Sequence, residues 1–429
     1  RVAMTLNNLA LLQSDNKDFQ NAEKNYREAL DIRRKLTEEN PNAFLAYVAM
    51  TLNNLASLQQ NNNDFQNAEK NYREALDIRR KLAEENPNAF LAYVASTLNN
   101  LASLQQNNND FQNAEKNYRE ALDIRRKLAE ENPNTFLAYV AMTLNNLASL
   151  QQNNNDFQNA EKNYREALDI RRKLAEENPN AFLADVAMTL NNLAILQKNN
   201  NDFQNAEKNY REALDICRKL AEENPNAFLA NVAMTLNNLA ILQKNNNDFQ
   251  NAEKNYREAL DICRKLAEEN PNAFLADVAM TLNNLAILQK NNNDFQNAEK
   301  NYREALDICR KLAEENPNAF LADVAMTLNN LAILQSDNKD LTNAEKNYHE
   351  ALDILRKLAE EKPKRFDLDY ADTLINFSDF YLKDIPNKEK SLQYVNKAIN
   401  HIAPYLKTVV WVQQLQSKAD ATITYWENN

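Results

Sequence analysis

The feature that most constrains this chain is a long internal repeat. Residues 48–93 read VAMTLNNLASLQQNNNDFQNAEKNYREALDIRRKLAEENPNAFLAY, and nearly the same string begins again 46 residues later. An earlier copy starts at Val2, and the later copies start at Val94, Val140, Val186, Val232, Val278 and Val324. Self-similarity at such a period is typical of stacked-repeat proteins, in which each unit buries its apolar face against its neighbours.

Each copy contains two helical patterns with apolar residues spaced three and four positions apart. The first pattern, helix A, has a stripe of Leu45, Val48, Ala49, Leu52, Leu55, Ala56 and Gln59. The second pattern, helix B, has a stripe of Ala68, Tyr72, Ala75, Leu76, Arg79 and Leu82. Because strand-type alternation is missing, the patterns predict antiparallel helix hairpins that stack into an all-α solenoid.

The ends of both helices also carry signals. Asn40 before Pro41 predicts an N-cap followed by proline in the first turn of helix A. Helix A should end near 61–63, where asparagine substitutes for glycine in a left-handed turn. We expect Asp64 to cap helix B, which should run to about Glu85.

The copies divide the chain into three parts. Residues 1–369 hold eight repeats, the first truncated at its start, and 370–403 hold a degenerate ninth repeat in which Ile375 replaces the first asparagine of a recurring pair. Residues 404–429 are predicted to form a C-terminal capping helix that starts at Pro404 and carries Trp411 and Trp426. We expect these tryptophans to pack in the cap, with an aromatic peptide site as the alternative. The chain opens within a repeat, so a longer protein is expected.

Composition argues against several functions. Glycine is absent, which removes the phosphate-binding loops and nucleophile elbows that need a residue without a Cβ. The two histidines, His349 and His401, have no cysteine near them, so no zinc site, catalytic residue or cofactor is expected. A net charge of −11 argues against binding to nucleic acid or anionic membrane, and no apolar run has membrane-spanning length.

Three cysteines occupy equivalent places on successive B helices. Cys217, Cys263 and Cys309 stand where Arg79 and Arg125 stand in earlier copies. Packed helices lie about 8 to 10 Å apart, which is too far for a disulfide between equivalent positions. We therefore expect reduced, partly buried thiols and a cytoplasmic location.

The strings TLNNLALL and AEKNYREALDIRRKL resemble the tetratricopeptide repeat family, most closely its long-repeat branch typified by kinesin light chain. The resemblance covers residues 2 to about 402 and rests on small Ala10, Ala22 and Ala29 with Leu6, Leu9 and Tyr26. The repeat is about one helical turn longer than in that branch, and asparagine or lysine replaces the usual turn glycine. The resemblance implies a right-handed superhelix whose concave face is lined by helix A.

On that implied concave face, a helical wheel places Tyr47, Met50, Asn53, Asn54 and Ser57 beside the core stripe. An asparagine side chain can bond both the N–H and the C=O of an extended peptide. The resemblance carries peptide binding over to the asparagine pair of each copy. The pairs are Asn7 and Asn8, Asn53 and Asn54, Asn99 and Asn100, Asn145 and Asn146, Asn191 and Asn192, Asn237 and Asn238, Asn283 and Asn284, and Asn329 and Asn330. The alternative is that one asparagine of each pair bonds between neighbouring repeats.

Differences among the copies suggest groove anchors. Tyr47, Tyr93 and Tyr139 become Asp185, Asn231, Asp277 and Asp323 in later copies. Gln60 and its equivalents become Lys198, Lys244 and Lys290, while Ser57 and its equivalents become isoleucine. Either the two halves of the groove hold different ligand segments, or the differences reflect block duplication.

The co-chaperone clamp of this family, which grips acidic tails with cations from helix A, is not expected. Helix A of the first four copies, such as 48–60, contains no lysine or arginine.

The sequence therefore predicts a noncatalytic scaffold that binds an extended peptide of a partner protein. The alternative is a sensor or regulatory arm of a larger signalling, defence or motor-adaptor protein with its effector domain upstream. Self-association has no supporting feature.

Overall fold

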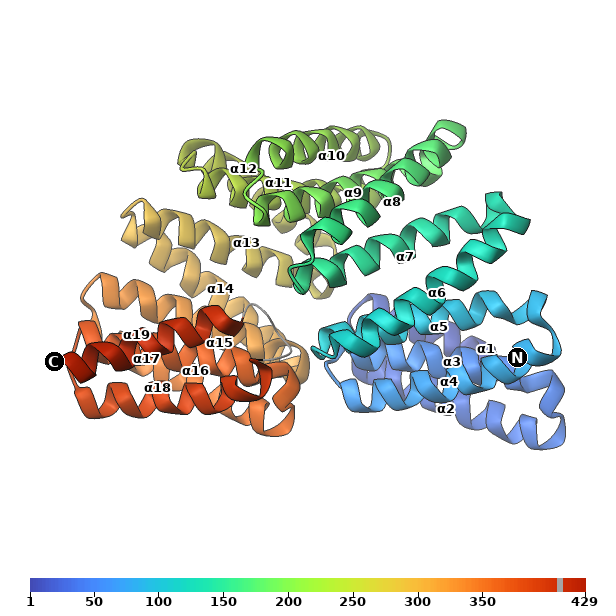
Figure 1. Ribbon diagram of the computed structural model, residues 1–429, viewed down its shortest axis with the longest axis horizontal. Helices are drawn as coiled ribbons and strands as arrows, with labels where there is room; N and C mark the ends of the chain where they lie inside the picture. Colours follow the sequence, from blue (N-terminus) through green and yellow to red (C-terminus); the bar gives the residue numbers. More distant parts are fainter. Residues whose placement is uncertain (407–411) are drawn as a thin grey trace. The chain divides into compact units, whose positions relative to one another are not determined.

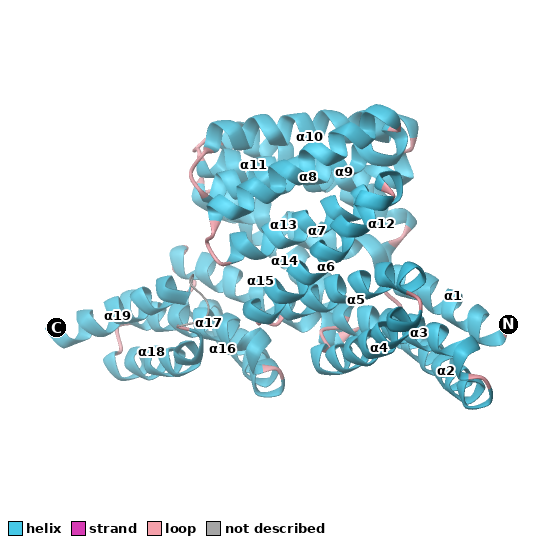
Figure 2. Cartoon of the chain, turned by 45° about the vertical axis from the view of Figure 1, so that its right-hand side comes forward, coloured by secondary structure: helices cyan, strands magenta, loops and turns pink. Residues whose placement is uncertain are grey.

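A computed structural model describes residues 1–406 and 412–429, with every side chain among them except that of Asn42. The chain divides into two compact units. The first comprises Arg1–Asn238 with Leu266–Ala273, and the second comprises Leu239–Lys265 with Phe274–Asn429. Helices account for nearly all of the described residues, and no strand occurs among them (Figure 2).

Every copy folds into two helices joined by short loops, as predicted (Figure 1). The A helices are α1 (Val2–Asp15), α3 (Pro41–Asn61), α5 (Pro87–Asn107), α7 (Pro133–Asn153), α9 (Pro179–Asn199), α11 (Pro225–Asn245), α13 (Pro271–Asn291), α15 (Pro317–Asp337) and α17 (Pro363–Lys383). The B helices are α2 (Phe19–Glu39), α4 (Phe65–Glu85), α6 (Phe111–Glu131), α8 (Phe157–Glu177), α10 (Phe203–Glu223), α12 (Phe249–Glu269), α14 (Phe295–Glu315), α16 (Leu341–Glu361) and α18 (Lys388–Ile402).

The predicted helix ends are confirmed. The Asn40 side chain accepts a hydrogen bond from the Ala43 N–H at 3.3 Å, and Pro41 opens α3. Helix α3 ends at Asn61, and two residues later Asn63 has a φ of 55°, in the left-handed region. Asp64 then caps α4 through the Asn67 N–H at 3.5 Å. The same turn recurs with positive φ at Lys17, Asn109, Asn155, Asn201, Asn247, Asn293 and Lys339.

The core stripes are confirmed as well. Leu52 and Ala56 of α3 and Tyr72 and Ala75 of α4 are each at most 1% exposed. Side chains of α3, α4, α5 and α6 meet in one apolar cluster that includes Ala56, Tyr72 and Leu98, with Phe90 packed against it. Burial of this continuous apolar surface between hairpins is the main stabilising contribution, since each hairpin alone would expose half of it.

Within each unit, every helix packs on the next one along the chain. This holds from α1 to α10 in the first unit and from α14 to α18 in the second. Successive A helices also approach one another, as α1 does α3, α3 does α5, α5 does α7 and α7 does α9. The fold is therefore an all-α solenoid of antiparallel helix hairpins, with the A helices of the first unit drawn together along one side.

The C-terminal end differs from the prediction in two details. The proposed boundary at 369–370 falls inside α17, so the ninth hairpin begins at Pro363. Pro404 lies in a single 3-10 turn (Ala403–Tyr405), and the last helix, α19 (Val412–Asn428), starts later. Proline in a first turn fits either kind of helix. Trp411 lies outside the described residues.

The other tryptophan packs in the cap. The Trp426 indole N–H donates to the Ser391 hydroxyl of α18 at 2.8 Å, and the Lys388 ammonium lies 5.9 Å from the ring centroid. These contacts tie α19 to α18 and give Trp426 a structural role at the end of the array.

Candidate functional site

The two asparagines of each pair lie in different surroundings. The first member is buried at seven of the eight pairs, with exposures between 2% and 7%, and Asn53 is half-buried. The buried first members are Asn7, Asn99, Asn145, Asn191, Asn237, Asn283 and Asn329. The second member is half-buried at Asn54, Asn100, Asn146, Asn192, Asn238, Asn284 and Asn330, and Asn8 is exposed.

Hydrogen bonds join the pairs of neighbouring repeats. The Asn100 amide donates to the Asn53 carbonyl oxygen at 3.4 Å, and Asn146 donates to Asn99 at 3.2 Å. Asn192 likewise donates to Asn145 at 3.1 Å. At these three junctions the second asparagine of one repeat bonds to the first asparagine of the repeat before it, which is the inter-repeat alternative that the sequence left open. The carbonyl oxygens of Asn7, Asn191 and Asn283 have no hydrogen-bond partner among the described residues.

The end of the array has the same arrangement. Asn376 of α17 donates to the Asn329 carbonyl oxygen at 3.3 Å, while the first position of this pair is Ile375, only 1% exposed. Helix α19, which packs on α17, has no asparagine pair that could donate a hydrogen bond at this position. An apolar side chain at the first position avoids a buried acceptor without a partner there.

Two first-position asparagines bond differently. The Asn191 amide donates to the Ala187 carbonyl at 3.2 Å and to the Thr235 hydroxyl of the next A helix at 2.9 Å. Asn283 makes the same contacts with Ala279 and Thr327. In both cases the first asparagine again ties its helix to the next repeat.

The second asparagines keep polar atoms for a ligand. An amide group has two N–H donors and one carbonyl acceptor. The bonds to the preceding repeat use one N–H of Asn100, Asn146 and Asn192. Each of these half-buried side chains still has a carbonyl oxygen and one N–H with which to meet an extended peptide.

The predicted anchors lie beside these asparagines. Tyr47, Tyr93 and Tyr139 are 50%, 54% and 46% exposed, and Asp185 and Asp277 are half-buried. Lys198, Lys244 and Lys290 are also half-buried, and burial lowers the pKa of Lys244. Lys290 pairs with Asp337 at 3.0 Å. Exposed methionines, such as Met188 and Met234, add apolar surface to the A helices.

The B helices present a different surface. Glu69 and Arg73, four residues apart on α4, form an ion pair at 2.6 Å. Arg34 of α2 also reaches Glu74 of α4 at 2.6 Å, and the same bridge between successive B helices recurs at Arg80, Arg126 and Arg172. The charges of this face are largely satisfied by one another, as expected for a solvated outer surface.

One residue of the helix B stripe is an arginine, and it is buried. Arg79 is 7% exposed, and its Nη1 group donates to the Tyr93 carbonyl at 3.2 Å, to the Asn53 carbonyl oxygen at 3.4 Å and to the Thr97 hydroxyl. The guanidinium carbon lies 5.5 Å from the centroid of the Tyr93 ring. Burial lowers the pKa of Arg79 to about 10, since removing the cation from water disfavours its charged form.

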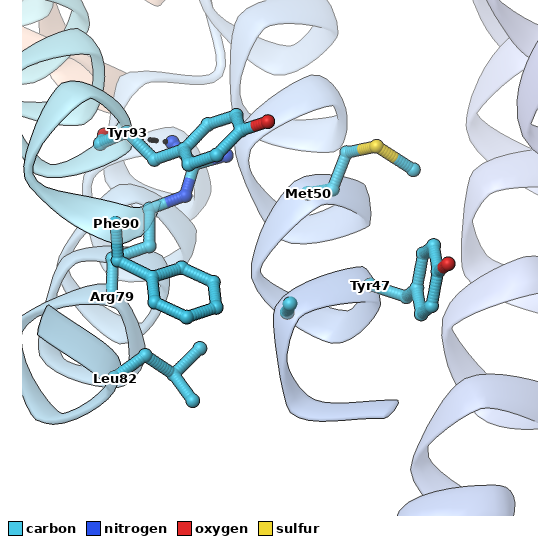
Figure 3. A pocket seen from close by; sticks show the side chains of 7 residues that line it. Tyr47, Met50, Arg79, Leu82, Phe90 and Tyr93 are labelled. Carbon is cyan, nitrogen blue, oxygen red and sulfur yellow. Dashed lines mark hydrogen bonds between the residues drawn. The ribbon is translucent and has the colours of Figure 1, made fainter. Parts of the chain in front are cut away.

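A cavity of about 240 Å³ opens beside this guanidinium (Figure 3). Arg79, Leu82, Phe90 and Tyr93 form one wall, and Tyr47 and Met50 of α3 face them. The next copy has an equivalent cavity of about 210 Å³ lined by Arg125, Phe136 and Tyr139, with Tyr93 and Ser96 opposite. The two cavities lie on the same side of the hairpins as the exposed tyrosines.

In later copies both the buried arginine of helix B and the tyrosine of the next helix A are replaced. Arg171 donates to the backbone carbonyl of Asp185 at 3.1 Å, and the Asp185 carboxylate favours its charged form, although burial still lowers the pKa of Arg171 overall. In the following copies the arginine becomes Cys217, Cys263 or Cys309, all free thiols that are more fully buried than predicted. Burial, with Asp277 as a further cause, raises the pKa of Cys263 to about 11, so its thiol stays protonated at neutral pH.

The serine and glutamine changes are also linked by contact. Gln60 donates to the Ser103 hydroxyl at 3.3 Å and accepts from the Tyr72 hydroxyl at 3.4 Å. Copies with isoleucine and lysine at these positions lose this chain, and the buried hydroxyls of Tyr210 and Tyr256 have no hydrogen-bond partner among the described residues. The serine and glutamine positions that differ between the two sets of copies are therefore in contact with each other in the early copies.

Sequence reasoning missed the arginine cavities. A charged letter in the buried stripe of a helix was the available signal, because a buried cation needs polar partners. The tyrosine on the next helix was identified as an anchor, but its contact with this arginine joins two copies and has no local pattern.

No group of three or more histidine, cysteine, aspartate or glutamate side chains is placed to hold a metal in the described part of the chain. Among the same residues, no helix has the length and apolarity needed to cross a bilayer.

The chain is therefore a helical-repeat protein, and its A helices carry nearly the same set of side chains in each copy. The family model for the tetratricopeptide repeat matches residues 1–81, 47–127, 93–173, 139–219, 185–265 and 231–311, and a second tetratricopeptide repeat model matches 324–362. The chain belongs to the tetratricopeptide repeat family. No curated protein sequence matches it.

The chain is similar to two solved structures. Apo RapI aligns over 95% of this chain and 99% of its own, at 16% identity and a TM-score of 0.54. BtubC (BKLC) from P. vanneervenii aligns over 58% of this chain and 92% of its own, at 27% identity and a TM-score of 0.48. The likeness to RapI supports the solenoid fold along nearly the whole chain.

Proposed function

We propose that this chain is a noncatalytic scaffold that binds an extended peptide segment of a partner protein along its A helices. The observation that supports this most is the second asparagine of each pair. It recurs in every copy and is half-buried in all but the first, and Asn100, Asn146 and Asn192 each keep a carbonyl oxygen and an N–H after bonding to the preceding repeat. Binding through backbone groups needs such a regular series of amides.

The expected strength follows from the number of amides engaged. A net hydrogen bond contributes about 0.5 to 1.5 kcal/mol, and association itself costs several kcal/mol. Contacts from three or four second-position asparagines, aided by the exposed tyrosines, support a dissociation constant on the order of micromolar. The first asparagines, which the sequence placed in the same ladder, contribute to stability instead because they are buried between repeats.

The test uses the intact chain and a phage-displayed library of random peptides. Selected peptides are synthesised with a fluorophore, and their dissociation constants are measured by fluorescence anisotropy on the parent and on Asn100→Ala/Asn146→Ala/Asn192→Ala. We expect at least tenfold weaker binding by this variant. The control is Gln66→Ala/Gln112→Ala/Gln158→Ala, which removes exposed amides from B helices and should leave binding unchanged.

Two results would overturn the proposal. One is a library that yields no peptide binder to the folded chain. The other is a set of binders that lose equal affinity in the A-helix variant and in the B-helix control.

A further inference from the structure

We propose that the cavity beside Arg79 receives the carboxylate of an acidic side chain from the bound segment, and that the cavity beside Arg125 is a second site of the same kind. This inference rests on the proposed function and adds the chemistry of the ligand. It assigns a guanidinium of helix B, rather than a cation of helix A, as the group that recognises the acid.

The guanidinium of Arg79 has hydrogen-bond donors that are not used within the described part of the protein. All of its hydrogen bonds come from Nη1, and the acceptors are neutral oxygens of Asn53, Tyr93 and Thr97. Its Nε and Nη2 groups bond to none of the described residues, and no described carboxylate pairs with this cation. Nε and Nη2 form the edge of an arginine that holds a carboxylate through two parallel hydrogen bonds. Nη1 therefore fixes the side chain while the opposite edge stays available.

The second cavity repeats most of this arrangement. Arg125 is 2% exposed and donates through Nη1 to the Tyr139 carbonyl at 3.2 Å and to the Thr143 hydroxyl. Its Nη2 has a long contact of 3.5 Å with the Ser96 hydroxyl, where the preceding copy has Met50. A single weak hydroxyl contact leaves the positive charge without an anionic partner.

The walls define the rest of the ligand. Leu82, Phe90 and Met50 present apolar atoms, and the Tyr47 and Tyr93 rings complete the lining. Such walls suit the methylene groups of a glutamate or aspartate better than a hydrated inorganic ion. A purely apolar side chain would bury the free N–H groups without acceptors, which is costly, and a lysine would be repelled. A carboxylate on a short aliphatic stem satisfies both the donors and the walls.

Only the early copies have this chemistry. Arg171 already lies beside Asp185, and the following copies have a neutral thiol in place of the guanidinium. An acidic residue of the ligand should therefore be read by the repeats that contain Arg79 and Arg125. The later copies also supply a matched variant, because cysteine at this position is a replacement that the fold accommodates at Cys217.

The experiment compares one selected peptide and its amide versions on four proteins. The probe is a peptide selected from the library, together with versions in which each acidic residue is changed from Glu to Gln or from Asp to Asn. The proteins are the parent, Arg79→Cys/Arg125→Cys, Arg79→Met and the control Arg171→Cys, each checked by its thermal unfolding. On the parent and on the control, neutralising one acidic residue should weaken binding about tenfold or more. On Arg79→Cys/Arg125→Cys the acid and amide peptides should bind within a factor of two of each other.

The outcomes separate this inference from the proposed function. If the second-position asparagine variant weakens binding but the acid-to-amide ratio is the same on the parent and the arginine variants, the carboxylate site is wrong and the scaffold stands. If sodium phosphate alone displaces the peptide at millimolar concentration from the parent but not from the arginine variants, the cavity is a free-anion site and the inference is overturned. If acetate and phosphate both fail to compete while the ratio collapses in the arginine variants, the side-chain carboxylate is supported.

Discussion

At the scale of single residues, a rotation of about 100° separates the two asparagines of each pair along the helix. That step leaves Asn99 buried, where it accepts from the Asn146 amide of the next repeat, and leaves Asn100 half-buried. The two residues have the same chemistry, so their roles differ through burial alone. A polar group between repeats fixes how far one hairpin is rotated against the next, because its partner must lie opposite.

The first prediction concerns this division of roles. Asn99→Ala removes the acceptor of the Asn146 amide and should lower the free energy of unfolding by about 1 to 3 kcal/mol. Asn100→Ala removes a half-buried donor and should lower it by less than about 1 kcal/mol. Denaturant unfolding followed by circular dichroism measures both, with Gln112→Ala as the control. Equal losses at the two positions would contradict the assignment.

A second prediction tests the core stripe. Leu144 is 0% exposed, so Leu144→Ala should cost about 2 to 5 kcal/mol of stability through the cavity it leaves. Met188→Ala, at a position 39% exposed on the next A helix, should change stability by about 0.5 kcal/mol or less. Denaturant unfolding that shows no difference between the two variants would mean that the helical phase is wrong.

Sequence reasoning at this scale succeeded where a residue acts through its own helix. The buried positions of Leu52 and Tyr72 and the exposed Tyr93 follow from helical spacing. The partner of Asn99 and the cavity beside Arg79 depend on a side chain that belongs to another copy. The sequence of a single copy does not show which of its two adjacent asparagines contacts the neighbouring repeat.

At the scale of elements, the hairpin turn is made without glycine. Asn63 holds a φ of 55°, and the equivalent Lys17 and Lys339 hold 59° and 64°. Residues with a Cβ pay about 1 to 2 kcal/mol in this region, and asparagine tolerates it best because its side chain can bond locally. The Asn-rich string after helix A therefore predicted the turn correctly.

A third prediction follows from this turn. Asn63→Val should lower stability by about 1 to 2 kcal/mol, because a β-branched residue fits the left-handed region poorly. Asn63→Gly should be neutral or slightly stabilising, since glycine adopts positive φ freely. The measurement is the thermal unfolding of both variants. The control is Asn61→Val, at an exposed position in the last turn of α3. A larger loss for glycine than for valine would contradict the turn geometry.

Helix ends were predictable wherever a cap residue marks them, as at Asn40 and Asp64. The exception is the C-terminal end, where Pro404 is the middle residue of a 3-10 turn. Proline fixes φ but does not select between a 3-10 turn and an α-helix, so packing on α17 and α18 decides. The contacts of α19 with both helices show where that packing occurs.

At the scale of the whole molecule, every copy buries one tyrosine of helix B. Burial raises the pKa of Tyr26 and of Tyr72 to about 12, and it raises those of Tyr118, Tyr164, Tyr210, Tyr256, Tyr302 and Tyr348 as well. Because the raised tyrosine pKa recurs in every one of these copies, it should affect the stability of the whole chain.

The fourth prediction is a loss of stability at alkaline pH. An unfolded tyrosine has a pKa near 10, so between about pH 10 and 12 the folded chain keeps protons that the unfolded chain releases, and stability falls as pH rises. The buried arginines act in the opposite direction over about pH 10 to 12.5, but they occur only in the first four copies. The unfolding temperature should therefore drop between about pH 10 and 12, together with a rise in tyrosinate absorbance. An unchanged unfolding temperature with early tyrosinate formation would contradict the buried state of these side chains.

The most direct test of the account is to locate the bound peptide by photo-crosslinking. A photoreactive amino acid is placed at Tyr47, Tyr93 or Met188 on the A helices, or at Gln66, Gln112 or Gln158 on the B helices, and each protein is irradiated with a library-selected peptide. The account predicts crosslinks to the A-helix positions, lost when unlabelled peptide competes, and none to the B-helix positions. Competable crosslinks confined to the B helices would contradict it.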